Sequence, residues 1–340
     1  MESEKGTVSV ILVEETLGLA RRGGLDAIPL LEAAGVSPAV LESPRSRITS
    51  DQYGALWNSI AIALDDEFFG QDTHPMRSGS FVAMTRAALT AQTGGRALAR
   101  SVAFMRLVLD DLHVQISAKD NSVRLEFVHP EQNQAPTMFA YATYFLLVYG
   151  LVCWLVGKRI SVLRACFRCP EPAAVGEYKL LFCEALTFGQ DATYVDLTSD
   201  FVDLPVVQTN RSVNVFLRDA PGNFIVKYRN PDSLAARVRQ FLRENPIRNW
   251  PTSSALARQF HLSEATMRRR LRREGQTYLS IKDQLRRDFA IGALQGSDRP
   301  IGAIAQELGF AEPSAFYRAF QKWTGLRPSD YRSVKHNQIK

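Results

Sequence analysis

Residues 301–332, IGAIAQELGFAEPSAFYRAFQKWTGLRPSDYR, are the stretch that decides the fold. They predict two short helices joined by a tight corner at Gly309, followed by a further helical turn. Phe316 and Phe320 are four residues apart and so share one helix face, whereas Arg318 lies on a different side. The pattern indicates a small helical unit that buries two aromatic rings and leaves an arginine to reach an anion.

An earlier segment repeats this pattern. Each copy has a short helix with a small alanine, and then a second helix with the order apolar, any, Arg, any, apolar. The matching pieces are LARQF (256–260) with IAQEL (304–308), and MRRRL (267–271) with FYRAF (316–320). The repeat predicts two helix-turn-helix units in the C-terminal part of the chain.

Residues at the helix starts support the same two units. Ser263 is expected to cap the second helix of the first unit, and Glu312 with Pro313 to do the same in the second. A long helix is expected to link them. The predicted bounds are about 254–273 for the first unit, about 278–295 for the linker helix and about 301–322 for the second unit.

Charge separates the two parts of the chain. Residues 231–340 contain 20 Lys and Arg against 10 Asp and Glu, whereas residues 1–230 contain 21 against 25. A basic end on a slightly acidic body indicates a module for a polyanion, although a solvated basic face would have the same composition. We place the domain boundary near Tyr228–Asp232, where Asn230 and Pro231 are typical of a helix start.

Residues 1–230 predict an α+β domain. A change from helical to alternating periodicity at residues 113–128, around a DN turn, indicates a hairpin. The sequence has no GxGxxG and no Walker-type loop. The predicted helices are 24–35, 51–64, 95–112 and 174–185, and the predicted strands after the hairpin are 160–167 and 193–198. An all-α C-terminal domain is expected to follow, starting with a helix whose inner face carries Leu234, Val238, Phe241 and Leu242.

An uncharged run from Met138 to Gly157 has two interpretations. Its twenty residues are long enough to cross a bilayer, and Lys158-Arg159 follow it. Three tyrosines and a threonine interrupt the run, which is typical of a helix buried between the layers of a domain. We predict the buried helix, and no membrane association.

Four cysteines, Cys153, Cys166, Cys169 and Cys183, include one CxxC pair. A zinc site would need two further ligands nearby, and a redox pair would lie at a helix start. The sequence has no histidine between residues 130 and 260, and the pair follows a predicted strand. We therefore predict buried reduced thiols, with no metal, no cofactor and no catalytic residue.

The C-terminal signature resembles a known family. The order IxxIAxxxGFxExSxFxRxF, followed by Gly325, Pro328 and Tyr331-Arg332, resembles the AraC/XylS transcription regulators almost position by position. The resemblance covers residues 232–333. It implies two recognition helices that enter successive major grooves, ~34 Å apart, which a linker helix of about 27 Å suits.

The resemblance assigns roles residue by residue. The implied base-reading positions are Ala265, Thr266, Arg268 and Arg269 in the first unit, and Pro313, Ser314, Tyr317 and Arg318 in the second. The phosphate candidates are Arg270, Arg272, Arg273 and Lys322, and exposure to solvent alone is the alternative for the three arginines. The implied domain-core signature is Ala257, Leu262, Met267, Leu271, Ile304, Ala305, Gly309, Phe310, Phe316, Phe320, Gly325, Pro328 and Tyr331.

The two recognition helices differ in chemistry. Arg268 or Arg269 could bind a guanine edge in bidentate fashion, worth ~1–3 kcal/mol of discrimination, or both could hold phosphates. Pro313 and Ser314 are small, so the second unit is expected to read bases weakly. Arg318 could then serve a phosphate.

Residues of about 15–215 resemble the sensor domain of one AraC-type branch, which is labelled arabinose-binding and includes ornithine-utilisation regulators. GGLDAIPLLEAAG, ITSDQYGALWNSI, LDDEFFG and the segment 171–207 carry the likeness. It implies a domain that senses a small molecule or mediates dimerisation, and the label does not establish arabinose as the ligand. Arg100, Arg106 and Arg164 could pair with a ligand carboxylate or take part in structural ion pairs.

We therefore expect a cytoplasmic transcription regulator, an activator that binds promoter DNA, contacts RNA polymerase, responds to a small-molecule effector and can form a homodimer. One alternative is a ligand-independent regulator whose N-terminal domain only dimerises. Another is a DNA-binding domain fused to a cysteine-dependent enzyme, such as an alkyl-transfer repair protein.

Overall fold

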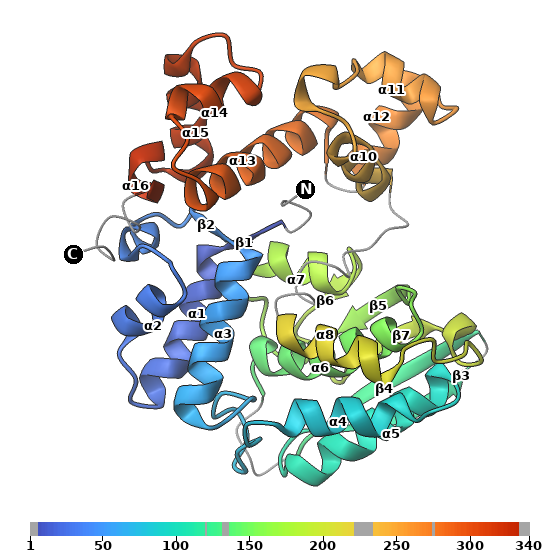
Figure 1. The fold of residues 1–340 in the computed structure, drawn as a ribbon. Coiled ribbons are helices and arrows are strands. Elements are labelled where there is room, and N and C mark those ends of the chain that lie inside the picture. The colour runs from blue at the N-terminus through green and yellow to red at the C-terminus, as the bar shows by residue number, and fades with distance from the viewer. Residues whose placement is uncertain (1–5, 120, 131–135, 221–233, 274–275, 333–340) are drawn as a thin grey trace. The chain divides into compact units, whose positions relative to one another are not determined.

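The computed structural model divides the chain into two compact units (Figure 1). The structure describes residues 6–119, 121–130, 136–220, 234–273 and 276–332. We call residues 11–34 and 50–230 the sheet unit, and residues 1–10, 35–49 and 231–340 the helical unit. The expected boundary at Tyr228–Asp232 and the expected cap Asn230 lie outside the described residues.

The sheet unit has the α+β class that the sequence predicts. Its strands are β3 (His113–Lys119), β4 (Ser122–Val128), β5 (Val162–Cys166), β6 (Leu186–Thr187) and β7 (Thr193–Thr198). Its helices are α1 (Val10–Arg22), α2 (Ala27–Ala33), α3 (Ser50–Leu64), α4 (Ser80–Leu89), α5 (Gly94–Val108), α6 (Met138–Leu155), α7 (Val175–Leu181) and α8 (Asn210–Asp219).

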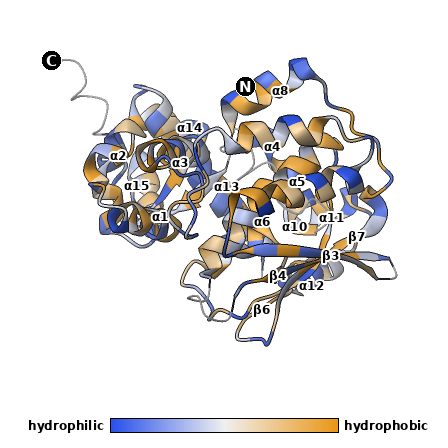
Figure 2. Cartoon of the chain, turned by 90° about the horizontal axis from the view of Figure 1, so that it is seen from below, coloured by the Kyte–Doolittle hydropathy of each residue, from blue (hydrophilic) through white to orange (hydrophobic). Residues whose placement is uncertain are grey.

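The sheet runs in the order β3-β4-β7-β5-β6. The predicted hairpin is confirmed, because β3 pairs antiparallel with β4 and His113 lies opposite Val128. Val123, Leu125 and Phe127 alternate along β4 and are buried. Helices α4, α5 and α6 lie on one side of this sheet, and the ribbon of α5 changes between hydrophilic and hydrophobic colours along its length (Figure 2). The alternation of β4 therefore marks the face that these helices cover.

The uncharged run forms α6, and every residue of this helix is buried. It is long and apolar enough to cross a membrane, yet 94% of its apolar window is buried inside the protein. Thr137 caps its start by accepting a hydrogen bond from the Ala140 N–H, and the Tyr149 hydroxyl donates to the Ile160 carbonyl at 2.6 Å. The prediction of a buried helix inside the domain is confirmed.

The helical unit contains two helix-turn-helix motifs joined by one long helix. The first motif is α11 (Ser253–Gln259) with α12 (Glu264–Arg273), and the second is α14 (Ile301–Glu307) with α15 (Pro313–Thr324). The linker is α13 (Tyr278–Gly296). Further elements of this unit are α10 (Leu234–Arg243), α16 (Pro328–Arg332), the strands β1 (Thr7–Ser9) and β2 (Arg47–Thr49), and two 3-10 helices, Pro38–Glu42 and Ile247–Asn249.

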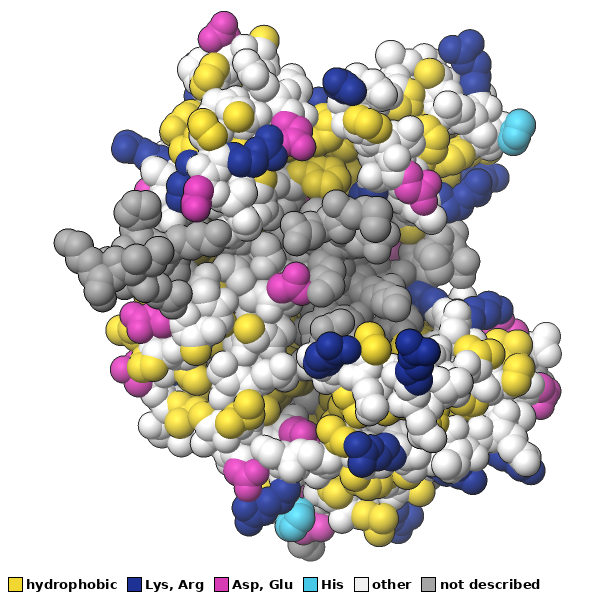
Figure 3. Space-filling model, viewed as in Figure 1, with side chains coloured by type: hydrophobic (Ala, Val, Ile, Leu, Met, Phe, Trp, Pro, Cys, Tyr) yellow, Lys and Arg dark blue, Asp and Glu magenta, His cyan; other side chains and the backbone are white. Residues whose placement is uncertain are grey.

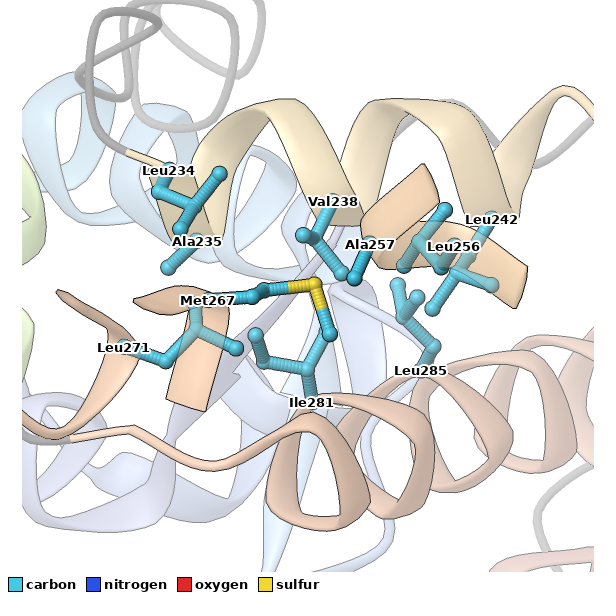
Figure 4. Close-up of a cluster of buried hydrophobic side chains, with 10 residues drawn as sticks. All are labelled: Leu234, Ala235, Val238, Leu242, Leu256, Ala257, Met267, Leu271, Ile281 and Leu285. Carbon is cyan, nitrogen blue, oxygen red and sulfur yellow. The ribbon is translucent and has the colours of Figure 1, made fainter. Parts of the chain in front are cut away.

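Each motif packs on its own hydrophobic core. In the first, Met267 of α12 lies among side chains of α10, α11 and α13, including Ile281 (Figure 4). In the second, Phe316 and Phe320 of α15 are fully buried with Ile304 of α14. Ile281 comes from the first half of α13, whereas its second half supplies residues to the second core. The linker helix is thus a part of both cores rather than a free connection.

Two segments from the start of the chain complete the second motif. Strands β1 and β2 pair antiparallel, with Val8 opposite Ile48. The hydroxyls of Ser43 and Ser46 donate to the Thr324 carbonyl at 2.8 and 3.2 Å. That carbonyl ends α15 and has no partner within the helix, so the two serines satisfy it.

Further hydrogen bonds hold β1 and β2 to the same half of the helical unit. The Arg47 N–H donates to the Tyr331 hydroxyl at 3.2 Å, and the Thr7 hydroxyl donates to the Asp288 carboxylate at 2.6 Å. Burial raises the pKa of Tyr331 above its ordinary value, which keeps the hydroxyl neutral.

Several elements were absent from the sequence prediction. Strands β1, β2 and β6 are three residues or shorter, too short to show a period of two. Helices α1, α4 and α8 were also missed, and the predicted helix 174–185 is wrong at its end, because α7 stops at Leu181. Phe182 has a ψ of −87° and is not helical.

Candidate nucleic-acid interface

Helix α12 begins at a side-chain cap. Ser263 accepts a hydrogen bond from the Thr266 N–H at 3.2 Å and donates to the Thr266 hydroxyl at 2.8 Å. The predicted cap is confirmed, and it holds Thr266, a base-reading candidate, half-buried at the helix start. The cap fixes the direction in which the remaining residues of α12 leave the domain.

One face of α12 is buried and the other is cationic. Met267 and Leu271 are at most 1% exposed, as their four-residue spacing requires. Arg268, Arg269, Arg270 and Arg272 are all exposed, together with Ala265. Within the described residues, none of these four arginines forms a salt bridge, so their charge is directed to solvent.

The exposed face also has a shape suited to a ligand. Arg268, Arg269 and Arg272 line one open hollow together with Ala265 and Thr266. Figure 3 shows Lys and Arg side chains on the surface of the first motif. Two small side chains beside three guanidinium groups let a polyanion approach closely, and a guanidinium fork matches both phosphate oxygens and a guanine edge. The side chain of Arg273 lies outside the described part.

Helix α15 presents a different surface. Its exposed candidates are Pro313, Ser314, Tyr317, Arg318 and Lys322, and Tyr317 is 38% exposed. Glu312 occupies the cap position, but its side chain makes no capping hydrogen bond, so the expected equivalence with Ser263 is wrong at this detail. Pro313, the first helical residue, has no N–H that would need a cap. The start of α15 thus depends on the proline instead of a side-chain oxygen.

The residues of the implied signature lie in the interior of the motifs or at their corners. Gly309 and Gly325 adopt left-handed backbone conformations, with φ of +80° and +79°, which a glycine adopts without strain. Leu262 and Phe310 are half-buried. The buried members are Ala257, Met267, Leu271, Ile304, Ala305, Phe316, Phe320, Pro328 and Tyr331.

In the sheet unit, two of the three arginines considered as ligand contacts bond to groups of the protein itself. Arg164 and Arg124 donate to the Asp196 carboxylate at 2.7 and 2.8 Å. Burial opposes the charge of Asp196, but the two arginines outweigh it and hold its pKa below the usual range. Arg100 donates to the Thr90 hydroxyl at 2.6 Å, and Arg106 is exposed. The Arg164 pair is therefore structural.

Three of the four cysteines are buried. All four are free thiols, and Cys153, Cys169 and Cys183 are buried. Burial raises the pKa of Cys153 and of Cys169 to about 11, whereas a nucleophilic or metal-binding cysteine needs a lowered pKa. Among the described residues, no group of three His, Cys, Asp or Glu side chains is placed to hold a metal ion.

Comparison with protein families connects these features. A family described as the arabinose-binding domain of AraC transcription regulators, N-terminal, matches residues 24–206, which is more than half of the chain. A second, described as a helix-turn-helix domain, matches residues 256–333. The chain belongs to the AraC family of transcription regulators. The second match spans both motifs, so this AraC-family protein is a DNA-binding transcription regulator.

Similar proteins agree with this assignment. The ornithine utilization regulator of Pseudomonas aeruginosa is 29% identical over 332 residues, covering 96% of each chain. The HTH-type transcriptional regulator VqsM of the same organism is 36% identical over 103 residues, covering 30% of this chain and 31% of VqsM. The virulence regulon transcriptional activator VirF of Shigella flexneri is 27% identical over 99 residues, covering 29% of this chain and 37% of VirF.

Sequence reasoning missed one group of contacts at this interface. Ser43 and Ser46 bond to the second motif, and Arg47 bonds to α16, from nearly three hundred residues away in the sequence. Single polar residues in a segment of irregular pattern carry no signal of such a distant partner.

Proposed function

We propose that this AraC-family regulator binds promoter DNA through both motifs, with α12 supplying most of the base discrimination and α15 adding weaker contacts. The observation that carries the proposal is the difference between the two exposed faces. Arg268, Arg269 and Arg272 share one hollow on α12, whereas α15 exposes a proline, a serine and a tyrosine beside Arg318.

Arginine chemistry supports this division of roles. A bidentate contact from Arg268 or Arg269 to guanine is worth ~1–3 kcal/mol of discrimination against other bases. Arg270 and Arg272 then neutralise phosphates and release counterions, which adds affinity without sequence preference. Lys322 and Arg318 do the same for the second motif. Pro313 has no donor for a base edge, so α15 discriminates less.

The linker helix supports binding to two successive major grooves. A helix of 19 residues is about 28 Å long, and adjacent major grooves lie ~34 Å apart on one DNA face. Because each half of α13 belongs to the core of one motif, its length sets the separation of α12 and α15.

The protein acts by equilibrium binding in the cytoplasm and not by catalysis, and it activates transcription through contact with RNA polymerase. The activator name of VirF favours this sign of regulation. The sheet unit modulates binding through a small-molecule effector, with a coupling free energy of ~1–3 kcal/mol. The full-length likeness to the ornithine utilization regulator makes L-ornithine the first effector to test.

The test is chromatin immunoprecipitation with sequencing in the source cell. We expect sharp promoter peaks for the wild-type chain, lost in the double variant Arg268→Ala/Arg269→Ala. The matched control is Tyr317→Ala/Arg318→Ala, which should weaken the same peaks without removing them. Peaks that survive the first double variant unchanged would contradict the proposal.

The effector is tested separately, by operator affinity with and without L-ornithine and related basic amino acids. A change of fivefold or more, on the order of 1 kcal/mol, supports a sensing sheet unit. An unchanged affinity, together with a dimer in sedimentation, favours a sheet unit that only dimerises.

A further inference from the structure

The two motifs contact each other beside the linker helix as well as through it. Arg286 lies near the middle of α13. Its guanidinium carbon is 5.6 Å from the Trp250 ring centroid and 6.0 Å from the Phe310 ring centroid. Trp250 precedes the first motif, and Phe310 stands at the corner of the second. One cation therefore lies within reach of an aromatic ring on each side.

Both rings are held in place by their own motifs. The Trp250 indole N–H donates to the carbonyls of Leu242 and Asn245 at 2.7 and 3.1 Å, at the end of α10. Phe310 packs against Phe316 of α15, with ring centroids 5.6 Å apart. A shift of α15 would thus move Phe310 against the guanidinium.

The segment between α10 and α11 reaches the second motif directly as well. Ile247 lies in this segment yet packs against the core of the second motif. A Cβ at Gly309 would be 3.8 Å from the Ile247 side chain and 4.0 Å from the Arg286 guanidinium. Both residues therefore lie next to the corner of the second motif, where an added methyl group would touch them.

The environment of Arg286 differs from that of an arginine exposed to solvent or to DNA. Its Nε is buried and has no hydrogen-bond partner among the described residues. Arg286 as a whole is half-buried, and it forms no salt bridge among the described residues. The faces of aromatic rings stabilise such a cation. These are the contacts that Trp250 and Phe310 provide.

We propose that Arg286, sandwiched between Trp250 and Phe310, is a positioning residue that fixes the orientation of the second motif relative to the first. The regulator consequently accepts one spacing between its two half-sites. The part that concerns half-sites rests on the proposed function. The part that concerns orientation stands on the contacts alone.

The orientation of the second motif relative to the first is tested without DNA, by double electron–electron resonance between two spin labels on the full-length chain. Labels at Gln259→Cys of α11 and Gln321→Cys of α15 are exposed. A Cys166→Ser background removes the partly exposed native thiol. The variants are Arg286→Met, which keeps an unbranched stem, and Phe310→Leu, which keeps an apolar side chain. The control is Lys282→Met, which removes the cation 4.8 Å from the Tyr278 ring on the same helix.

We expect a narrow distance distribution for the parent chain and for Lys282→Met, and at least a twofold broader one for Arg286→Met and Phe310→Leu. An unchanged width in both variants would overturn the proposal, because the linker helix alone would then set the orientation. Circular dichroism confirms that the variants are folded. If one of them unfolds, the other decides.

The consequence for half-sites is tested with an operator that the wild-type chain selects in vitro. Three kinds of DNA are compared: the operator with its native spacing, the operator with two base pairs inserted between the half-sites, and each half-site as a separate duplex. Two base pairs rotate one half-site by roughly 70°. We expect the insertion to lower the affinity of the wild type more than tenfold and the affinity of Arg286→Met less than threefold. The affinity of Arg286→Met for the separate half-sites should equal that of the wild type. Equal losses on the half-sites would make Arg286 a DNA contact and overturn the proposal.

A wild-type chain that selects no site would contradict the proposed function. The spin-label distances would still decide the orientation, so the two failures are distinguishable.

Discussion

The two helix-turn-helix motifs have the same architecture, but their second helices differ in two respects: the residues on the exposed face and the contacts of the C-terminal end. Helix α12 exposes four arginines, and its core partners among the described residues come from α10, α11 and α13. Helix α15 exposes small and aromatic residues, and its final carbonyl is bound by Ser43 and Ser46. One repeated fold thus carries two different surfaces, a cationic face in the first copy and a connection to the start of the chain in the second.

The two strands that pack beside the second motif, β1 and β2, are each followed in the chain by a helix of the sheet unit. Strand β1 continues directly into α1, and β2 continues directly into α3. Apart from Val10, both helices belong to the sheet unit. The chain therefore runs straight into the sheet unit from strands that are hydrogen-bonded beside α13 and α16.

The largest expected effect is the difference in operator affinity lost when the exposed residues of α12 or of α15 are replaced. We expect Arg268→Ala/Arg269→Ala to lower operator affinity about 100-fold or more, since each guanine contact is worth ~1–3 kcal/mol. Tyr317→Ala/Arg318→Ala should cost about tenfold or less. Fluorescence anisotropy on the selected operator measures both. A larger loss from the second pair would reverse the comparison.

Gly325→Ala tests the attachment of the second motif. Its φ is +79°, and a Cβ there would clash with the Ser43 hydroxyl. We expect the free energy of unfolding to fall by about 1–3 kcal/mol, in thermal or urea denaturation. Gly296→Ala is the control, because it ends α13 in open space and should stabilise the fold by about 0.4–1 kcal/mol. Equal effects at both glycines would show that Ser43 does not constrain α15.

Tyr331→Phe also tests how the start of the chain is held to the helical unit, with a smaller expected loss of stability. It removes the hydroxyl that accepts the Arg47 N–H and should cost about 1 kcal/mol of stability. Tyr278→Phe, which removes the hydroxyl that donates to the Pro251 carbonyl at 2.7 Å, should cost a similar amount. Hydrogen exchange distinguishes them, because the Arg47 amide should exchange faster only in Tyr331→Phe. Slow exchange in both variants would count against the attachment.

The smallest effects concern phosphate contacts. We expect Arg270→Ala, Arg272→Ala and Lys322→Ala each to reduce the slope of log affinity against log salt by about 0.9. Each should weaken specific and non-specific DNA equally. A variant that changes base preference instead would move that residue to the base-reading set.

Local patterns were sufficient to predict the motifs. The four-residue spacing of Phe316 and Phe320 and the repeat of MRRRL in FYRAF depend only on neighbours within a helix. The structure buries those rings and places Ser263 as a cap. The β3–β4 hairpin was equally local, because a DN turn joins two alternating runs.

Contacts between distant segments could not be predicted in this way. The serines that bind Thr324 lie in a segment without period, and Arg286 is one of two adjacent arginines on α13. Only the fold shows that its neighbours are Trp250 and Phe310. The surroundings of Asp196 likewise depend on which strands pair, since its two arginines come from β4 and β5.

The central claim, that α12 reads bases more strongly than α15, is tested most directly by a base-pair substitution scan of the selected operator with the wild-type chain. The half-site of α12 is the one whose footprint disappears in Arg268→Ala/Arg269→Ala. We predict losses of about 1–3 kcal/mol for substitutions in that half-site and less than about 1 kcal/mol in the other. Equal losses in both half-sites, or larger losses in the half-site of α15, would contradict the account.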